Sequence, residues 1–289
     1  MILITGGSRF VGCHLIARLE PKNSIRCLVR KTSSAAGLEG CQMAYGDINN
    51  MDSLIKATKG IDAVVHLVAA LGASNYGENY KVHVEGAKNL IEACKVNKVN
   101  RIVVASSVAT LAERKSDYGT TKAMADELFL ASGLDVTILK PDFIYGKDGK
   151  GFMTLVNVIS RKRIIPIVGD GRYRRQPVHV DDVAAAIFKS LSSKAIGKTY
   201  IIASKEPIEF NVMVDMIANK LEIKKRKVHF PIWFLLFAAK LAKIKKNPML
   251  TQTVILGIAQ DRCADISPMI NELGVKPRSF REGLDEVLK

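Results

Sequence analysis

Residues 1–12 read MILITGGSRFVG, and this stretch decides the fold. Ile2–Thr5 is apolar or β-branched throughout and predicts a buried strand. The strand runs into Gly6 and Gly7, and apolar residues at helical spacing then predict a helix over Val11–Leu19. A strand, a glycine turn and a helix in immediate succession are typical of the first half of a βαβ unit, which builds a parallel sheet.

The glycines of this turn have separate roles. Gly6 permits the tight turn, Gly7 keeps side-chain bulk away from the backbone, and Gly12 allows close contact between helix and strand. The helix N-terminus then presents free N–H groups to a pyrophosphate. An ordinary strand–helix turn is the alternative, but the position at the start of a long βαβ series favours dinucleotide binding. The predicted cofactor-binding residues of the turn are Gly6, Gly7, Ser8, Arg9, Phe10, Val11 and Gly12.

The residues after the second strand indicate which dinucleotide binds. NAD-binding domains usually carry an acidic residue there, which holds the ribose 2′-hydroxyl. Here no Asp or Glu occurs between Glu20 and Glu39. Arg30 can grip a 2′-phosphate through charge-assisted hydrogen bonds, with Lys31 and Ser33 beside it. A solvated basic loop is the alternative; we expect NADP(H) rather than NAD.

The first two-thirds of the chain alternates short apolar runs with amphipathic stretches, which predicts a parallel sheet. Further strands are expected at Ile25–Val29, Ala63–Val68, Ile102–Ala105, Val136–Leu139 and Thr199–Ile202. Helices are expected at Asp52–Thr58, Glu78–Val96, Asp117–Ala131 and Asp181–Leu191 and, where the alternation loosens, at Glu209–Leu221, Ile232–Ile244, Thr251–Gln260 and Arg281–Leu288. The predicted fold is α/β: a Rossmann-type doubly wound sheet of about six parallel strands with a smaller, mainly helical C-terminal substrate lobe. We expect residues 1–140 with 179–203 to bind the dinucleotide, and residues 141–178 with 204–289 to form the substrate-binding lobe.

Two features of the middle of the chain predict catalysis together. The strand Ile102–Ala105 ends in Ser106 and Ser107, which places hydroxyls at the carboxyl edge of the sheet, where ligands bind. Tyr118 and Lys122 are four residues apart and share one helix face. A free tyrosine has a pKa of about 10, so we expect Lys122 and a nicotinamide cation to lower the pKa of Tyr118. Tyr118 would then exchange a proton with a substrate oxygen, Ser107 would hydrogen-bond that oxygen, and Lys122 would position the nicotinamide ribose. An exposed tyrosine and lysine on a helix surface are the alternative.

The motifs TGGSRFVG, YGDI, VVHLVAA, VHVEGAKNLIEAC, IVVASS, YGTTK, LKPDFIYG and GDGRYRRQPVHVDDVA occur in this order over the first two hundred residues. As a set they resemble the extended short-chain dehydrogenases/reductases, the NAD(P)-dependent epimerase/dehydratase relatives. The resemblance implies that Asp47 and Ile48 contact adenine, that Ala69 lines the cofactor groove, and that Lys140 and Pro141 lie near the nicotinamide. It also places Arg175 where sugar-nucleotide enzymes have a diphosphate-binding arginine.

The chain departs from this family pattern in three places. Arg9 replaces a glycine of the turn, and only ten residues separate Ser107 from Tyr118, which shortens the loop over the active site. The run Gln176-Pro177-Val178 is closer to the branch that resembles the NADPH-binding accessory subunit of respiratory complex I. Members of that branch are often structural.

Composition sets further limits. Hydrophobic residues at 48% and charged residues at 25% exclude a disordered or fibrous protein. The five cysteines lack C-x-x-C spacing and predict buried free thiols in a reducing compartment. We expect no metal site, His66 as a core residue bonded to the backbone, and Asp181 or Asp182 as a helix cap.

The net charge of +15 will attract anionic partners. The apolar run Phe230–Ala239 is too short to span a membrane and is flanked by lysines. We interpret it as a core helix of the second lobe or a lid over an apolar substrate, with docking of residues 230–246 on a membrane surface as the alternative. The expected location is cytoplasmic, free or peripheral at a membrane; nucleic acid is not an expected partner, and a homodimer is an open alternative.

Three hypotheses for function follow. The leading one is an NADP(H)-dependent oxidoreductase or epimerase that acts on a hydroxyl or carbonyl carbon of a small-molecule substrate, either a nucleotide-linked sugar or a lipid-like alcohol. The second is a structural or assembly protein that holds NADPH as a fixed ligand. The third is an RNA-binding protein on a Rossmann scaffold. Fold does not separate them, because function resides in the site.

Overall fold

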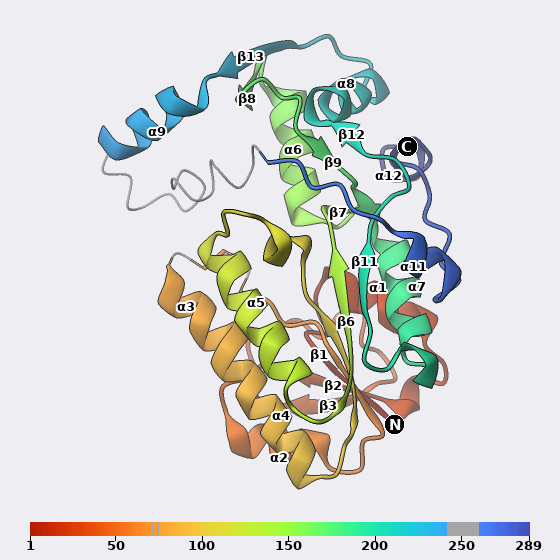
Figure 1. Ribbon diagram of the computed structural model, residues 1–289. Coiled ribbons are helices and arrows are strands. Elements are labelled where there is room, and N and C mark those ends of the chain that lie inside the picture. The colour runs from red at the N-terminus through yellow and green to blue at the C-terminus, as the bar shows by residue number, and fades with distance from the viewer. Residues whose placement is uncertain (71, 74, 242–259) are drawn as a thin grey trace.

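The computed structural model describes residues 1–70, 72–73, 75–241 and 260–289 (Figure 1). Its centre is a seven-stranded sheet in the order β11-β6-β5-β4-β1-β2-β3, in which every neighbouring pair is parallel. The strands are β1 (Ile2–Thr5), β2 (Ile25–Val29), β3 (Gln42–Tyr45), β4 (Ala63–His66), β5 (Arg101–Ala105), β6 (Asp135–Pro141) and β11 (Thr199–Ile202). The predicted Rossmann-type doubly wound sheet is confirmed, with one strand more than expected. The missed strand, β3, lies at the sheet edge and lacks a buried apolar run that would reveal it.

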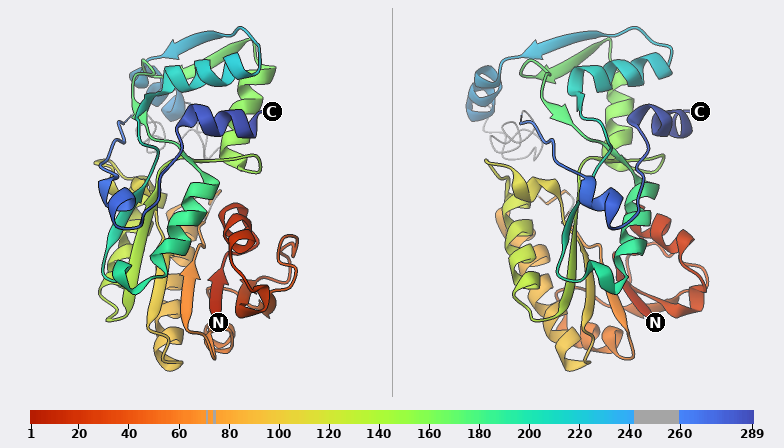
Figure 2. Two further views of the ribbon diagram at one scale, coloured as in Figure 1. Left: turned by 90° about the vertical axis from the view of Figure 1, so that its right-hand side faces the viewer. Right: turned by 45° about the vertical axis from the view of Figure 1, so that its right-hand side comes forward.

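Helices cover both faces of this sheet (Figure 2). Side chains alternate along each strand, so that Ile4 belongs to one apolar cluster and Leu3 to the other. The first cluster includes residues of α1 (Phe10–Arg18) and α7 (Val180–Ser190). The second includes residues of α2 (Met51–Thr58), α4 (Gly86–Val96) and α5 (Asp117–Leu130). Short 3₁₀ turns connect elements at η1 (Lys22–Ser24), η3 (Val108–Leu111) and η4 (Ser193–Ala195).

The single helix expected over Glu78–Val96 is divided. It consists of α3 (Tyr76–Tyr80), a π-helical turn η2 (Lys81–Glu85) and α4. A π turn inserts one residue and so offsets the apolar spacing by a single position, which the expectation of one continuous helix overlooked. Such turns are frequent at functional sites because the extra residue redirects side chains. Here the π turn carries His83, which contacts the candidate active site.

The rest of the chain forms the upper part of the molecule as Figure 1 shows it. Its helices are α6 (Lys150–Arg161), α8 (Phe210–Lys220), α9 (Ile232–Leu241) and α12 (Phe280–Val287). Helix α11 (Ser267–Asn271) instead lies beside β11, and its Met269 belongs to the first apolar cluster of the sheet (Figure 1). Its strands form three small sheets: β7 (Ile144–Tyr145) with β10 (Val178–His179), β9 (Arg174–Arg175) with β12 (Ile208–Glu209), and β8 (Ile164–Val168) with β13 (Arg226–Phe230).

A third apolar cluster holds these elements together. It joins Phe152 of α6, Ile167 of β8, Ile217 of α8 and Phe280 of α12 around the fully buried Tyr145. The expectation of a mainly helical lobe missed the small sheets and α6, because their segments are short and lie beside glycine-rich loops. The helix expected over Thr251–Gln260 lies outside the described residues, apart from its last residue, Gln260, which is not helical.

Candidate active site

The glycine turn between β1 and α1 forms a concave backbone surface. Gly6 has a φ of +79°, a conformation that favours glycine. A Cβ atom on Gly12 would overlap the carbonyl oxygen of Gly7 and lie 2.6 Å from its Cα. Arg9, the N-cap of α1, is exposed and makes no side-chain hydrogen bond to the helix. The turn therefore leaves the helix N-terminus open, and this cradle of bare backbone fits a pyrophosphate.

The loop after β2 carries the residues predicted to select the dinucleotide. Arg30 and Lys31 are exposed, and Ser33 is half-buried with its N–H donated to the carbonyl of Arg30 at 2.8 Å. The next acidic residue, Glu39, accepts a hydrogen bond from the N–H of Gly37 within its own turn. The structure thus presents cations directly at the carboxyl end of β2.

Asp47, Ile48 and Ala69, which the family resemblance assigned to the cofactor, follow β3 and β4 at the same edge of the sheet. The Asp47 carboxylate accepts the N–H of Asn49 at 2.9 Å. Ile48 is buried against Gly86, where a Cβ atom would lie 2.8 Å from the Ile48 Cγ1. These contacts fix the loops by which the adenine would be bound.

Lys122 is anchored in the sheet edge. Its side chain is buried, and Nζ donates hydrogen bonds to the carbonyl of Val68 at 3.1 Å and to that of Ala105 at 3.0 Å. These carbonyls belong to the chain just after β4 and at the end of β5. The ammonium therefore lies where the parallel strands end, one helical turn from Tyr118 on α5.

Ser107 ends up beside the start of the same helix. It follows β5, and its side chain caps η3 by accepting the N–H of Ala109 at 3.1 Å. Gly119 allows α5 to approach this turn, because a Cβ on Gly119 would lie 2.6 Å from the Ala109 carbonyl oxygen. The structure thereby brings the short Ser107–Tyr118 connection against α5, as the proposed chemistry requires.

The electrostatics of Tyr118 differ from the expectation. Burial, and secondarily the charge of Asp126, raises the pKa of Tyr118 to about 12. Burial lowers the pKa of Lys122 to about 8, although Asp126 acts in the opposite direction. Within the protein's own residues burial therefore dominates, because both groups lose water when they are buried together; the lowering expected from Lys122 together with a nicotinamide cation stays a prediction. A protonated Tyr118 is thereby favoured at neutral pH.

The sequence analysis missed His83, which lies against Tyr118. The two rings meet edge to face with centroids 5.2 Å apart. His83 Nε2 accepts the N–H of Ala70 at 3.0 Å, so Nδ1 carries the proton that it donates to the Thr121 hydroxyl at 2.8 Å. Burial, with the charge of Lys122, lowers the pKa of His83 to about 3. A neutral histidine thus connects the loop after β4 to α5; a lone histidine in an amphipathic helix could not have indicated this.

A buried polar network lies behind Lys122. The Asp126 carboxylate accepts the Ser106 hydroxyl at 2.8 Å and pairs with Lys140 at 3.2 Å. Lys140 and the buried Pro141 end β6, so both residues that the resemblance placed near the nicotinamide lie at the ligand edge of the sheet. Asp126 was not predicted, although its spacing of four from Lys122 puts it on the same helix face.

A small pocket of about 110 Å³ opens next to η3. One wall is apolar and consists of Val108, Leu111, Ala112, Ile201 and Ala203. The polar residues of the pocket include Asp142, Gln176 and Arg262. The pocket therefore combines an apolar wall with Arg262 and two carboxylates, those of Asp142 and Asp261.

Arg175 is buried behind this pocket, with its guanidinium 5.5 Å from the centre of the Tyr173 ring. Burial lowers the pKa of Arg175, against the charge of Asp142. The pKa of Arg262 is lowered by burial and by repulsion from Arg175. Two neighbouring guanidinium groups that repel each other would be stabilised by an anion.

Gln176, which departs from the family pattern, has a structural role. Its side-chain amide donates to the carbonyl of Ser204 at 3.0 Å and accepts the N–H of Ala264 at 2.7 Å. Its own N–H donates to the Asp142 carboxylate at 2.8 Å. Gln176 thus connects three segments that are distant in sequence around the pocket.

Three minor expectations need correction. His66 is buried as predicted, but its ring bonds to the hydroxyl of Thr5 at 2.8 Å rather than to the backbone. His179, and neither Asp181 nor Asp182, caps α7 by accepting the N–H of Asp181. The cysteines are free as expected, but only two are buried, Cys27 and Cys94.

The chain was compared with known proteins. The family model for the NAD dependent epimerase/dehydratase family matches residues 2–203. A ketoreductase of 4-hydroxy-2-methyl-3-oxo-4-farnesyl-3,4-dihydroquinoline-1-oxide from Stigmatella aurantiaca is 25% identical over 79% of this chain and 75% of its own. The 2-alkyl-3-oxoalkanoate reductase of Stenotrophomonas maltophilia is 24% identical over 98% of this chain and 97% of its own. The solved structure of MoeE5 in complex with UDP-glucose and NAD superposes with a TM-score of 0.80 and 25% identity, over 99% of this chain and 97% of that one.

The family model covers the sheet, the glycine turn, Tyr118 and Lys122, and the two relatives match most of the chain. The closer resemblance of residues 176–178 to the accessory subunit of respiratory complex I stays a prediction. With the glycine cradle and the anchored lysine on one sheet edge, these matches identify the protein as an enzyme that belongs to the NAD-dependent epimerase/dehydratase family.

Proposed function

We propose that the protein is an NADP(H)-dependent oxidoreductase that interconverts a hydroxyl and a carbonyl group on a lipid-like substrate. The position of Lys122 carries the proposal, because its ammonium is fixed by the carbonyls of Val68 and Ala105 at the sheet edge. There it can hold a ribose hydroxyl of a dinucleotide whose pyrophosphate rests on the glycine turn. The bound cofactor supplies or accepts the hydride.

The protein's own groups handle the oxygen and its proton. In the reducing direction Tyr118 donates its phenolic proton to the carbonyl oxygen, and the Ser107 hydroxyl donates a hydrogen bond to the same oxygen. A pKa of about 12 keeps Tyr118 protonated before the reaction, so the proton to be donated is present at neutral pH. Lys122 stabilises the negative charge that develops on the tyrosine oxygen as the proton leaves.

The choice of NADP(H) rests on the loop after β2. Arg30 and Lys31 are exposed there, and a guanidinium binds a 2′-phosphate in a forked geometry that a carboxylate would repel. The turn residues Gly6–Gly12 with Ser33, Asp47, Ile48, Ala69, Lys140 and Pro141 would complete the cofactor site.

The apolar wall of the pocket beside η3 supports a lipid-like substrate. The names of both curated relatives describe substrates with a keto group next to a farnesyl or alkyl group. We infer that the substrate presents its carbonyl to Tyr118 and an anionic group toward Arg262 and Arg175. A nucleotide sugar is the second candidate, because its diphosphate would suit the same arginines and UDP-glucose is bound in MoeE5.

The experiment is turnover of two substrate sets, each with the cofactor form that its chemistry needs: 3-oxo acids with a long 2-alkyl group are supplied with NADPH, and UDP-sugars with NADP+, and products are identified directly so that epimerisation without net redox change is also detected. We expect turnover of the first set to be at least about a hundredfold faster; preferential turnover of UDP-sugars would favour the second candidate. Replacing Tyr118 by Phe should abolish turnover while NADPH binding changes less than about twofold, because one proton donor is typically worth 10²–10⁴-fold in rate.

Tyr200→Phe is the matched control. Tyr200 is also buried, and its hydroxyl donates to Glu272 at 2.9 Å, away from the site. Its loss should reduce stability but not the rate per folded molecule. Unchanged turnover of Tyr118→Phe would reject the assigned role, and failure of the wild-type protein to bind either nicotinamide dinucleotide would reject the proposal as a whole.

A further inference from the structure

Helix α9 exposes large aromatic side chains. Trp233 is 70% exposed, Phe237 56% and Phe234 43%. Trp233 and Phe237 are four residues apart and so share one helix face. We call Trp233 and Phe237 the α9 patch. A helix with no polar face over its first two turns is normally buried, so its exposure indicates a surface that binds a partner.

The opposite side of α9 is attached to the protein. Ile232 packs against the turn at Gly169, where a Cβ atom would lie 3.5 Å from Ile232 Cγ1. The ring of Phe234 stacks on that of Phe230 with centroids 6.3 Å apart. The core-helix interpretation of this segment is therefore wrong for its described residues, because Trp233 and Phe237 point outward while the other side provides the anchor.

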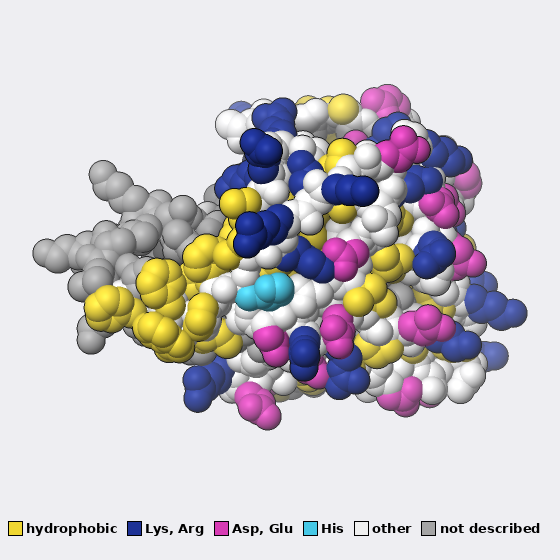
Figure 3. Space-filling model, turned by 90° about the horizontal axis from the view of Figure 1, so that it is seen from above, with side chains coloured by type: hydrophobic (Ala, Val, Ile, Leu, Met, Phe, Trp, Pro, Cys, Tyr) yellow, Lys and Arg dark blue, Asp and Glu magenta, His cyan; other side chains and the backbone are white. Residues whose placement is uncertain are grey.

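The chain around α9 is basic throughout. No Asp or Glu occurs between Glu222 and Asp261, and the cations in this interval are Lys224, Lys225, Arg226, Lys227, Lys240, Lys243, Lys245 and Lys246. Because β8 and β13 are parallel with Arg226 opposite Ile164, the cluster Arg161–Arg163 lies at the same edge as Lys224–Arg226. Figure 3 shows the α9 patch at one end of this face with Lys and Arg side chains beside it.

The dimensions of α9 decide how it can meet a bilayer. The ten described residues of α9, at 1.5 Å each, span about 15 Å, half the thickness of the hydrocarbon core, and the apolar run in the sequence is interrupted at Lys240. Within the described part of the chain, no helix is both long and apolar enough to cross a membrane. A short helix with tryptophan on its apolar face and cations around it is suited to lie in the interface instead.

We propose that the α9 patch docks the protein on an anionic lipid bilayer. Trp233 and Phe237 enter the boundary between headgroups and acyl chains, and Lys224, Lys225 and Arg226 with the neighbouring cluster Arg161–Arg163 bind lipid phosphates. The excess of cations along the chain before and after α9 favours an anionic lipid surface over a purely apolar partner, although Lys227 is paired with Asp215 and Asp170 lines the groove beside Trp233. The groove of about 540 Å³ under α9, lined by Tyr173, Pro231 and Trp233 among others, then faces the lipid surface.

The protein contains a single tryptophan, so its fluorescence reports on α9 alone. Full-length protein is mixed with vesicles of phosphatidylcholine, with or without 30 mol% phosphatidylglycerol (about a third, to give a strongly negative surface). We expect a blue shift of the emission, and quenching by lipids brominated near the headgroup, only with the anionic vesicles. Binding should weaken steeply as salt screens the charges.

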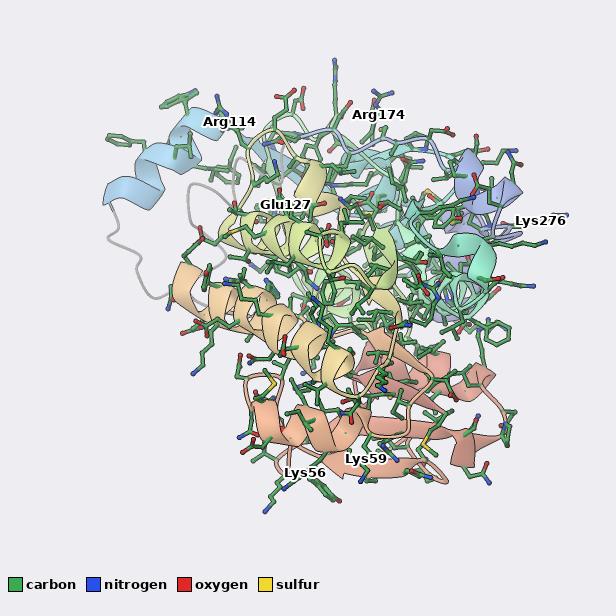
Figure 4. All side chains as sticks on the ribbon, turned by 60° about the horizontal axis from the view of Figure 1, so that its bottom comes forward. Lys56, Lys59, Arg114, Glu127, Arg174 and Lys276 are labelled. Carbon is green, nitrogen blue, oxygen red and sulfur yellow. The ribbon has the colours of Figure 1, made fainter. Side chains whose placement is uncertain are left out.

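Two pairs of variants test the patch and the charges by co-sedimentation with the same vesicles. Trp233→Ala with Phe237→Ala should lower the partition coefficient by about tenfold or more, because each aromatic contributes about 1.5–3 kcal/mol when buried. Phe188→Ala, which removes an aromatic of α7 that is 46% exposed, should leave it unchanged. Lys224→Ser with Arg226→Ser should weaken binding about tenfold, at about 1 kcal/mol for each cation. The control Lys56→Ser with Lys59→Ser removes two cations from the opposite end of the molecule (Figure 4) and should have no effect.

Three results would overturn the proposal. The first is the absence of a shift with anionic vesicles. The second is a dimer in sedimentation velocity that Trp233→Ala with Phe237→Ala dissociates, which would assign the patch to a second copy of the chain. The third is a blue shift on addition of NADPH and substrate without vesicles, which would make α9 a lid. None of these results bears on catalysis, because turnover of a short-chain, water-soluble 3-oxo acid by the patch variants tests the proposed function separately.

Discussion

Two surfaces at the carboxyl edge of the sheet, the glycine turn and the pocket beside η3, form in different ways. At the glycine turn, residues within one strand–turn–helix unit create the surface, and Gly6 and Gly12 lie six residues apart. Around the pocket beside η3, Gln176 must join Asp142, Ser204 and Ala264 before a surface exists. The first surface is therefore a property of local chain conformation, whereas the second depends on long-range contacts. Substitutions in the turn should therefore abolish cofactor binding. Substitutions around the pocket should each weaken substrate binding by a smaller amount.

The largest effect is expected from Gly12→Ala. The new Cβ would meet the Gly7 backbone, with 2.6 Å to Gly7 Cα, so the turn must open. We expect NADPH affinity to fall at least about a hundredfold and the melting temperature to fall as well. In Gly151→Ala, in α6, the Cβ meets nothing closer than 3.8 Å, and its stability should change by about 1 kcal/mol or less. Isothermal titration would measure the NADPH affinity of both variants, and thermal melts would measure their stability. Equal losses of affinity in Gly12→Ala and Gly151→Ala would contradict the special role of the turn.

The next effect concerns cofactor choice. Arg30→Ala should weaken NADPH binding about tenfold to a hundredfold and leave NADH binding unchanged, because a charge-assisted hydrogen bond is worth about 1.5–3 kcal/mol. Arg172→Ala, an exposed arginine of the upper part, is the matched control and should change neither. Parallel fluorescence titrations with the two nucleotides measure the ratio. A proportional loss for both nucleotides would show that Arg30 does not read the 2′-phosphate.

A moderate effect is expected from Asp126, as a positioning residue behind Lys122. Its carboxylate raises the pKa values of both Lys122 and Tyr118, so Asp126→Asn should lower both. Both groups act in their protonated forms, and the alkaline limb of kcat/KM should therefore move to lower pH. If the alkaline limb moves by one pH unit, kcat/KM at a given pH on that limb falls about tenfold.

Two variants keep this test interpretable. Asp126→Glu retains the charge and should restore the limb, and Glu127→Gln, at an exposed neighbour on the same helix (Figure 4), should leave it in place. If Asp126→Asn lowered activity equally at every pH, the carboxylate would act only in packing.

The smallest predicted effect is on stability. It concerns two ion pairs, one between helices that cover the sheet and one in the upper part of the molecule. His14 of α1 bonds to Asp181 of α7 at 2.7 Å, and Lys220 of α8 pairs with Asp285 of α12 at 2.7 Å. Burial alone would raise the pKa of Asp181, but the hydrogen bond and charge of His14 outweigh it and lower the pKa from 3.8. Because the folded pKa is below the unfolded one, the pair stabilises the fold above pH 3.8, and this contribution is lost as the pH falls through the lowered value.

Asp181→Asn should therefore reduce stability by about 1 kcal/mol or less at neutral pH and have no effect at the acid end of a series of melts. Asp285→Asn should be neutral at both ends, because Asp285 is exposed to solvent, which screens the pair. A larger loss from Asp285→Asn than from Asp181→Asn would reverse the order that we infer for the two regions.

Sequence patterns were sufficient where the signal is local. The six expected strands of the sheet, the conformation of Gly6 and the placement of Lys122 one turn after Tyr118 all follow from short-range periodicity and glycine chemistry. The pattern failed at β3, which has an edge position, at α6 and the small strands of the upper part, and at the π turn that carries His83. It also did not show that burial raises the pKa of Tyr118, because burial cannot be read from residue spacing.

The sequence by itself determined that a dinucleotide-type cradle opens a parallel sheet, that a tyrosine and a lysine share one helix face, and that cations follow the second strand. These are consequences of backbone geometry and of neighbours within a few residues. Only the tertiary structure decided that Lys122 is held by the Val68 and Ala105 carbonyls, that His83 lies against Tyr118, and that the α9 patch faces outward. Each of these depends on which distant segments exclude water from a side chain, and that selection is made only when the whole chain packs.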